Sequence, residues 1–239
     1  MKRNGFCSAG KKARIALAVM ALCGMTFVGA RDVLAADTAS SSYINAKMSD
    51  GKTASNNTTD GGAEQVVLGI NNTVANMKST IVGSENKMFS KSAPSLDEIY
   101  NTVIGTSNIC GDDNNSAILN TVVGAKNKAI STGAMAIGYQ NVASGTQSIA
   151  MGYQSDATEG YSTAIGNQTK VGAGNATGVG VQNMVSGSYA TSLGAINTAS
   201  GSNSIAIGNY NEAVNKNALA LGSGESKQKI VLLTKKLLR

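Results

Sequence analysis

The sequence predicts an all-β protein, a parallel β-solenoid built from coils of 14 residues. Three observations predict it. Glycines recur at a fixed spacing, a short aliphatic run precedes each of them, and the composition does not suit a thick globular core. Aromatic residues make up 4% of the chain, Trp is absent, and 28 glycines accompany one proline. Globular cores rely on large side chains, so this composition favours thin, repeated coils.

The glycine repeat sets the register. A glycine occurs every 14 residues from Gly124 to Gly222, and Gly69 and Gly83 are also 14 apart. The steps from Gly83 to Gly105 (22 residues) and from Gly105 to Gly124 (19) are each one repeat plus an insertion. We predict that each glycine ends a strand at a turn that a Cβ would obstruct. The predicted structural turn glycines are Gly69, Gly83, Gly105, Gly124, Gly138, Gly152, Gly166, Gly180, Gly194, Gly208 and Gly222.

The residues before each glycine alternate like a strand. The position directly before it is aliphatic or Met in all eleven repeats, from Leu68 to Leu221, and we predict that this column forms the core. The position three before it, often Thr, has the same parity and is expected to point inward too. The position two before it should then face outward, and it carries no charge. A small, uncharged outer column favours a subunit interface, although an inert monomer face is the alternative. The predicted trimer face is Val122, Ala136, Ala150, Ala164, Ala206 and Ala220.

A second strand follows a polar turn. Three residues after the glycine, eight of ten repeats have Asn, which suits turns and could form a ladder of stacked amides. A column of small apolar residues comes next and predicts a second inward-facing wall. The turn column is Asn72, Asn86, Asn108, Asn127, Asn141, Ser155, Thr169, Asn183, Asn197 and Asn211, and the small column is Ala129, Ala143, Ala157, Val171, Val185, Ala199 and Ala213.

The N-terminus has the order of a secretory signal. Residues 2–14 are basic, residues 15–30 are apolar, and small residues follow up to Ala36. We predict a signal peptide over 1–36, cleaved after Ala36 or one residue earlier; an uncleaved anchor helix is the alternative. The mature chain is expected to have no membrane span. The predicted domains are then a lead-in over 37–55, repeats over 56–222, and a neck-like tail over 223–239.

Two insertions interrupt the repeat, near 87–100 and 109–118. We expect both to form loops that leave the rod, and loops on rigid scaffolds often carry binding. Cys110 lies in the second insertion and is the only cysteine outside the signal segment. The sequence favours a tolerated loop cysteine, with an intersubunit disulfide or a reactive thiol as alternatives.

Charge and residue content exclude several functions. The net charge of +6 comes from the two termini, and residues 37–224 carry −3 with no basic stripe, so we expect no nucleic-acid binding. The absence of His excludes His-based triads and His metal sites. Asp112 and Asp113 are expected to form a solvated turn. We therefore predict no catalytic, cofactor or metal site, and no enzyme activity.

The sequence of the repeats is similar to that of a known protein family. Segments such as 148–152 (SIAMG) and 204–208 (SIAIG), with Ala-Ser-Gly at 143–145 and 199–201, resemble the head repeat of YadA-like trimeric autotransporter adhesins. The resemblance implies a left-handed parallel β-roll, a homotrimer, and display on a bacterial surface to bind a host matrix, cell-surface or bacterial ligand. The family continues into a stalk and a membrane barrel. Because this sequence ends at a neck-like tail, it is expected to be a fragment, a truncated gene or a released, secreted head.

Three functional classes follow. An adhesin head is the main interpretation. A structural or ice-binding solenoid is the second, supported by a partial column of threonines. A solenoid acyltransferase is the third, and both the 14-residue period and the missing His disfavour it.

Overall fold

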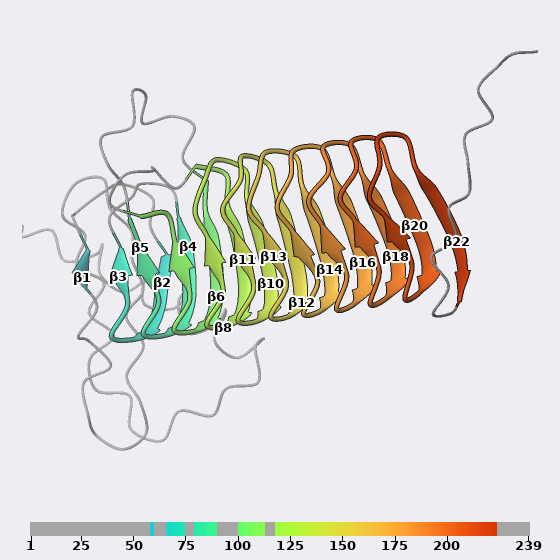
Figure 1. Cartoon of the computed structure of the whole chain (residues 1–239). Helices are drawn as coiled ribbons and strands as arrows, with labels where there is room; N and C mark the ends of the chain where they lie inside the picture. Colours follow the sequence, from blue (N-terminus) through green and yellow to red (C-terminus); the bar gives the residue numbers. More distant parts are fainter. Residues whose placement is uncertain (1–57, 60–65, 75–78, 90–99, 113–117, 224–239) are drawn as a thin grey trace, which may run out of the picture.

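The chain forms a rod of stacked coils (Figure 1). The computed structural model describes residues 58–59, 66–74, 79–89, 100–112 and 118–223. Each complete coil contributes one five-residue and one two-residue strand, and these join into two parallel sheets of eleven strands each among the described residues. The predicted signal peptide, the lead-in and residues 224–239 of the tail lie outside the described residues.

The strands alternate in length along the chain. The long strands are β2 (Val66–Ile70), β4 (Thr80–Ser84), β6 (Thr102–Thr106), β8 (Thr121–Ala125), β10 (Met135–Tyr139), β12 (Ile149–Tyr153), β14 (Thr163–Asn167), β16 (Thr177–Val181), β18 (Thr191–Ala195), β20 (Ile205–Asn209) and β22 (Leu219–Ser223). The short strands are β1 (Thr58–Thr59), β3 (Thr73–Val74), β5 (Lys87–Met88), β7 (Ile109–Cys110), β9 (Lys128–Ala129), β11 (Val142–Ala143), β13 (Asp156–Ala157), β15 (Lys170–Val171), β17 (Met184–Val185), β19 (Thr198–Ala199) and β21 (Glu212–Ala213).

Both insertions leave the register intact. Gly83 pairs with Gly105, and Gly105 pairs with Gly124, in the same alignment as in the regular coils. The predicted loop boundaries were too wide, because β5 and β7 belong to the coil. Residues 90–99 and 113–117, where the loops were expected, lie outside the described residues.

The repeated glycine lies inside each long strand, as its fourth residue, and not in the turn itself. All eleven glycines have φ between 117° and 133°, which L side chains rarely adopt. At Gly152 a Cβ would lie 1.9 Å from the carbonyl oxygen of Gly166 in the next coil. The turn follows two residues later, where φ is 52–58° in every coil from that of Gly69 to that of Gly208. Glycine is therefore needed both for its backbone angle and for the close stacking of coils.

The asparagine column forms the expected ladder. Asn141 receives a hydrogen bond from the Ser155 N–H (2.9 Å), and its own amide donates to the Gly152 carbonyl (2.8 Å). Where Ser155 and Thr169 replace Asn, the hydroxyl still donates to the glycine carbonyl of the next coil. These side chains are buried, so the ladder satisfies their own polar atoms together with the partly buried glycine carbonyls of the next coil.

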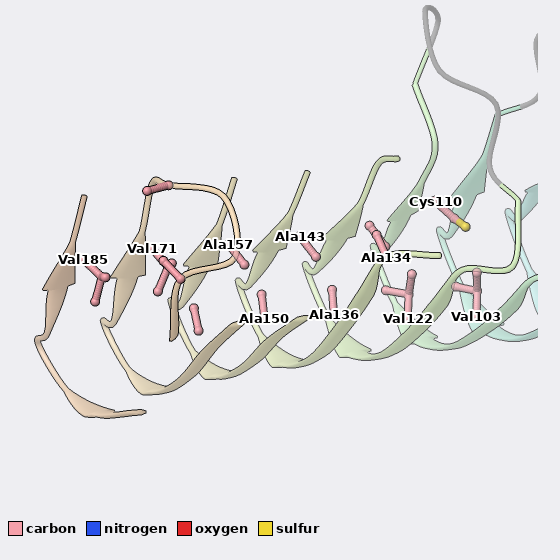
Figure 2. Packing of buried hydrophobic residues seen from close by; sticks show 14 of the residues in the cluster. Val103, Cys110, Val122, Ala134, Ala136, Ala143, Ala150, Ala157, Val171 and Val185 are labelled. Atoms are coloured by element: carbon pink, nitrogen blue, oxygen red, sulfur yellow. The ribbon is translucent and has the colours of Figure 1, made fainter. Parts of the chain in front are cut away.

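The core column is the opposite of the predicted one. The second residue of each long strand is buried, and it includes all six residues of the predicted trimer face: Val122, Ala136, Ala150, Ala164 and Ala206 at 0% exposure and Ala220 at 3%. That prediction was wrong. Figure 2 shows Val122, Ala136 and Ala150 pointing across the coil toward the small residues of the short strands, such as Ala143 and Ala157. The predicted core column before the glycine, and the Thr column with it, lie on the outer side.

In the coils from β10 on, the physical reason is the narrow cross-section of the coil. Ala150 and Ala157 fill it with two methyl groups, whereas the first coils bury larger side chains such as Ile81 and Met88. A Cβ on Gly178 would lie 2.9 Å and 3.2 Å from methyl carbons of Val171 and Val185. Because close-packed interiors do not absorb added volume, long aliphatic side chains point outward in these coils.

Candidate binding surfaces

One surface follows from the corrected orientation. We call it the apolar face: the first, third and fifth residues of the long strands, on the outer side of their sheet. It carries no charged residue in any of the eleven strands. Ile104 is 42% exposed and Leu221 is 43% exposed. A solvated sheet face ordinarily carries charge, so this face has the character of an interface.

The threonines belong to this face. Thr163, Thr177 and Thr191 occupy the first position of three successive long strands and are half-buried. Met135 and Ile149 interrupt the column before them, and Ile205 interrupts it after them. The threonines were expected to point inward. That expectation was wrong, because they lie on the same side of the strand as the residue before the glycine, which faces outward.

A groove runs along a different side of the rod, between the turn after each long strand and the short strand that follows. We call it the glutamine groove. It encloses about 840 Å³, and none of its residues belongs to the apolar face. It is lined by Lys126, Lys128, Gln140, Val142, Gln154, Asp156, Gln168, Lys170, Gln182, Asn183, Met184 and Ile196.

Four glutamines form a ladder along the groove. The Gln154 amide donates to Gln140 Oε1 (2.9 Å), and Gln168 donates in the same way to Gln154 (3.1 Å). Gln182 continues the series to Gln168 (3.1 Å). All four have φ between 52° and 55°, since they occupy the turn position. The sequence indicates this ladder, because Gln recurs every 14 residues at these positions, but the prediction considered only the Asn column.

The charges of the groove are mixed. Lys126, Lys128 and Lys170 lie along it with Asp156. Burial raises the pKa of the Asp156 carboxyl above its usual value, while the charge of Lys170 opposes that rise. Beside the groove, the rings of Tyr139 and Tyr153 stack with centroids 5.5 Å apart, and the Lys126 ammonium lies 5.7 Å from the Tyr139 ring centroid.

Cys110 is a core residue and not a loop residue. It is fully buried at the second position of β7, in the column that Ala129 occupies in the next coil. Burial raises the pKa of its thiol to about 12, against a hydrogen bond with Asn120 that lowers it. A buried, protonated thiol suits neither an intersubunit disulfide nor a reactive site, so both alternatives are excluded in this fold.

Within the part of the chain that the structure describes, no three Cys, Asp or Glu side chains gather into a group that could hold a metal ion. The same residues include no helix with the length and apolar character of a membrane span.

These features define a repeat protein: a parallel β-solenoid of 14-residue coils with a small-residue core and an uncharged outer face. The family model of the YadA head domain repeat, in two copies, matches residues 129–155, 143–169, 186–211 and 199–224. These segments therefore carry YadA head repeats, consistent with a YadA-like head region of a trimeric autotransporter adhesin. A comparison with curated proteins gives no match.

Proposed function

We propose that this chain is the head of a trimeric autotransporter adhesin, displayed on a bacterial surface. It attaches the cell to a host cell, to extracellular matrix or to other bacteria, and it performs no catalysis. The observation that carries the proposal is the apolar face, which the YadA head repeats present on coil after coil.

The face has the dimensions of a subunit interface. Ten coil steps at about 4.8 Å, and five residues at about 3.3 Å, give a surface of about 48 by 16 Å, or roughly 800 Å² on each chain. This is the usual contribution of one partner to a stable complex, and more than the largest apolar patch of many monomers. We propose a parallel homotrimer of left-handed rolls, as the family resemblance implies, with this face toward the neighbouring chains.

Adhesion follows from such an assembly. Three copies of every outward surface multiply weak contacts, so avidity does not require a strong single site. The export signal predicted over residues 1–36 supports a surface location.

The oligomeric state tests the proposal. Ile165 is the third residue of β14 and lies on the apolar face, while Val214 follows β21 on the other sheet, lies outside the glutamine groove and is 54% exposed. We expect the mature chain to be a trimer by light scattering, Ile165→Glu to be a folded monomer, and the control Val214→Glu to remain a trimer. A wild-type monomer, or a trimeric Ile165→Glu, would refute the interface. Adhesion of bacteria that express the wild type and each variant then tests the function.

A structural or ice-binding solenoid is the second candidate, because the structure places the threonine column outward. Thermal hysteresis of the purified chain would support it, whereas adhesion without hysteresis supports the adhesin.

A further inference from the structure

The glutamine groove has a repeating hydrogen-bonding surface that the ladder leaves incomplete. A glutamine side chain has two N–H donors and two acceptor lone pairs. Gln154 donates once to Gln140 and accepts once from Gln168, so it retains one donor and one acceptor. Gln168 is in the same position between Gln154 and Gln182.

The repeat distance favours one kind of polymer. The same donor and acceptor return with every coil, at about 4.8 Å. The sugar units of an extended polysaccharide advance by a similar distance, whereas each residue of an extended peptide advances by only about 3.3 Å. From Lys126 to Ile196 the groove spans five coil steps, or about 24 Å. It can therefore follow several sugar units in register.

The charge favours an anionic polymer. The described residues contain five lysines and five carboxylates. Three of these lysines line the groove, namely Lys126, Lys128 and Lys170, with only one carboxylate, Asp156. The groove is thus basic, whereas the remaining charges of the described residues are mostly carboxylates.

We infer that the glutamine groove binds an acidic polysaccharide along the axis of the rod. The lysines hold the carboxylate or sulfate groups, and the glutamine ladder binds the hydroxyls. The inference rests on the proposed adhesin function and names a ligand class for it. No residue that lines the groove belongs to the apolar face, although the two surfaces adjoin where Lys126 lies over the Tyr139 ring.

Calorimetric titration of the full mature chain tests the inference. Heparin oligosaccharides supply a sulfated probe, hyaluronan a carboxylated one, dextran a neutral one, and polyphosphate an anion without hydroxyls. We expect heparin or hyaluronan to bind more tightly than polyphosphate, and dextran not to bind. Binding by neither acidic polysaccharide, or equal binding of polyphosphate, would overturn the inference.

Variants locate the site. Replacing Lys126, Lys128 and Lys170 together by Gln should weaken binding about tenfold, from three exposed ion pairs of modest strength. Lys216→Gln, an exposed lysine outside the groove, is the matched control and should bind like the wild type. Equal binding by the triple variant and the control would refute the site. Because these lysines are surface residues, the triple variant is expected to fold, which circular dichroism checks.

A second variant separates hydroxyl recognition from charge. Gln154→Leu with Gln168→Leu should weaken polysaccharide binding and leave polyphosphate binding unchanged; an equal loss for both probes contradicts the role of the ladder. Light scattering on the same samples distinguishes the two proposals. A trimer that does not bind polysaccharide refutes the groove alone, and a monomer that binds refutes the trimer alone.

Discussion

The asparagine ladder makes a strong claim about stability, and Asn141→Ala tests it. Asn141 is fully buried, and its amide donates to the Gly152 carbonyl at 2.8 Å. Its Oδ1 accepts from the Ser155 N–H at 2.9 Å. The same amide also donates to Asn127 Oδ1 and to the Ile137 carbonyl, each at 2.9 Å. Alanine removes these hydrogen bonds and offers no replacement, so the Gly152 carbonyl and the Ser155 N–H, both in the next coil, lose this side-chain partner.

The magnitude follows from the two orphaned groups. A buried donor or acceptor left unsatisfied costs about 1–3 kcal/mol. Loss of both gives about 2–6 kcal/mol, a large part of the 5–15 kcal/mol that stabilises a typical domain. Asn141→Ser is the matched control, because Ser155 occupies the equivalent position one coil later and donates to Gly166 at 3.1 Å. It retains the bond to the glycine carbonyl, so we expect it to lose about half as much stability.

Urea unfolding followed by circular dichroism measures the difference at one protein concentration, since assembly would otherwise shift the midpoint. We expect the order wild type, Asn141→Ser, Asn141→Ala from most to least stable. Equal stability of the two variants would show that the amide does not hold the Gly152 carbonyl. An Asn141→Ala variant as stable as the wild type would refute the ladder as a stabilising element.

Three further predictions concern single positions. Gly152→Ala should destabilise the coil by about 3 kcal/mol or more, because the new Cβ would lie 1.9 Å from the Gly166 carbonyl oxygen and the backbone φ is 121°. The control is Gly172→Ala, where a Cβ would meet nothing nearer than 3.9 Å, and this variant should unfold at the same urea concentration as the wild type. Cys110 should resist iodoacetamide at pH 8 in the folded chain, because its pKa is about 12, and react in urea; rapid labelling of the folded chain, seen by mass spectrometry, would contradict its burial. The raised pKa of Asp156 means that the folded chain holds this proton more tightly, so its contribution to stability is full below a pH of about 4 and is lost as the pH rises through the raised pKa. Melting temperatures of the wild type relative to Asp156→Asn should therefore fall over that interval, and a constant difference would show that the carboxyl does not titrate as described.

The glycine period was enough to predict the fold and the register. Residues that recur at a fixed spacing lie side by side in the successive coils of a solenoid. The structure accordingly pairs Gly138 with Gly152 and Ala136 with Ala150. The asparagine ladder was also predictable, since Asn at a fixed period in a turn brings identical amides within hydrogen-bonding distance.

The direction of the side chains was not predictable from alternation alone. A period of two defines two sets of residues but does not say which set is inside. The prediction placed the larger residues inside, by analogy with globular cores. In the coils from β10 on the inner volume is small, so Ala150 lies inside and Met151 outside, although the first coils bury Ile81 and Met88. The glutamine groove was missed because residues such as Gln140 and Val142, two apart in the sequence, form a continuous groove only when successive coils stack.

The thin core has a consequence for stability. In the coil of Ala150 and Ala157 the core buries two methyl groups, worth about 1.6 kcal/mol at about 0.8 kcal/mol each. The outward Ile149 and Met151 of the same coil are already half-buried, so covering them with neighbouring chains would contribute roughly half of the 1.5–3 kcal/mol of full burial for each. Assembly through the apolar face would therefore contribute at least about as much as the core of the coil does by itself. The melting temperature of the wild type should then rise with protein concentration, while that of Ile165→Glu should not. Concentration-independent melting of the wild type, measured by circular dichroism over a hundredfold dilution series, would show that the apolar face stabilises no assembly in solution.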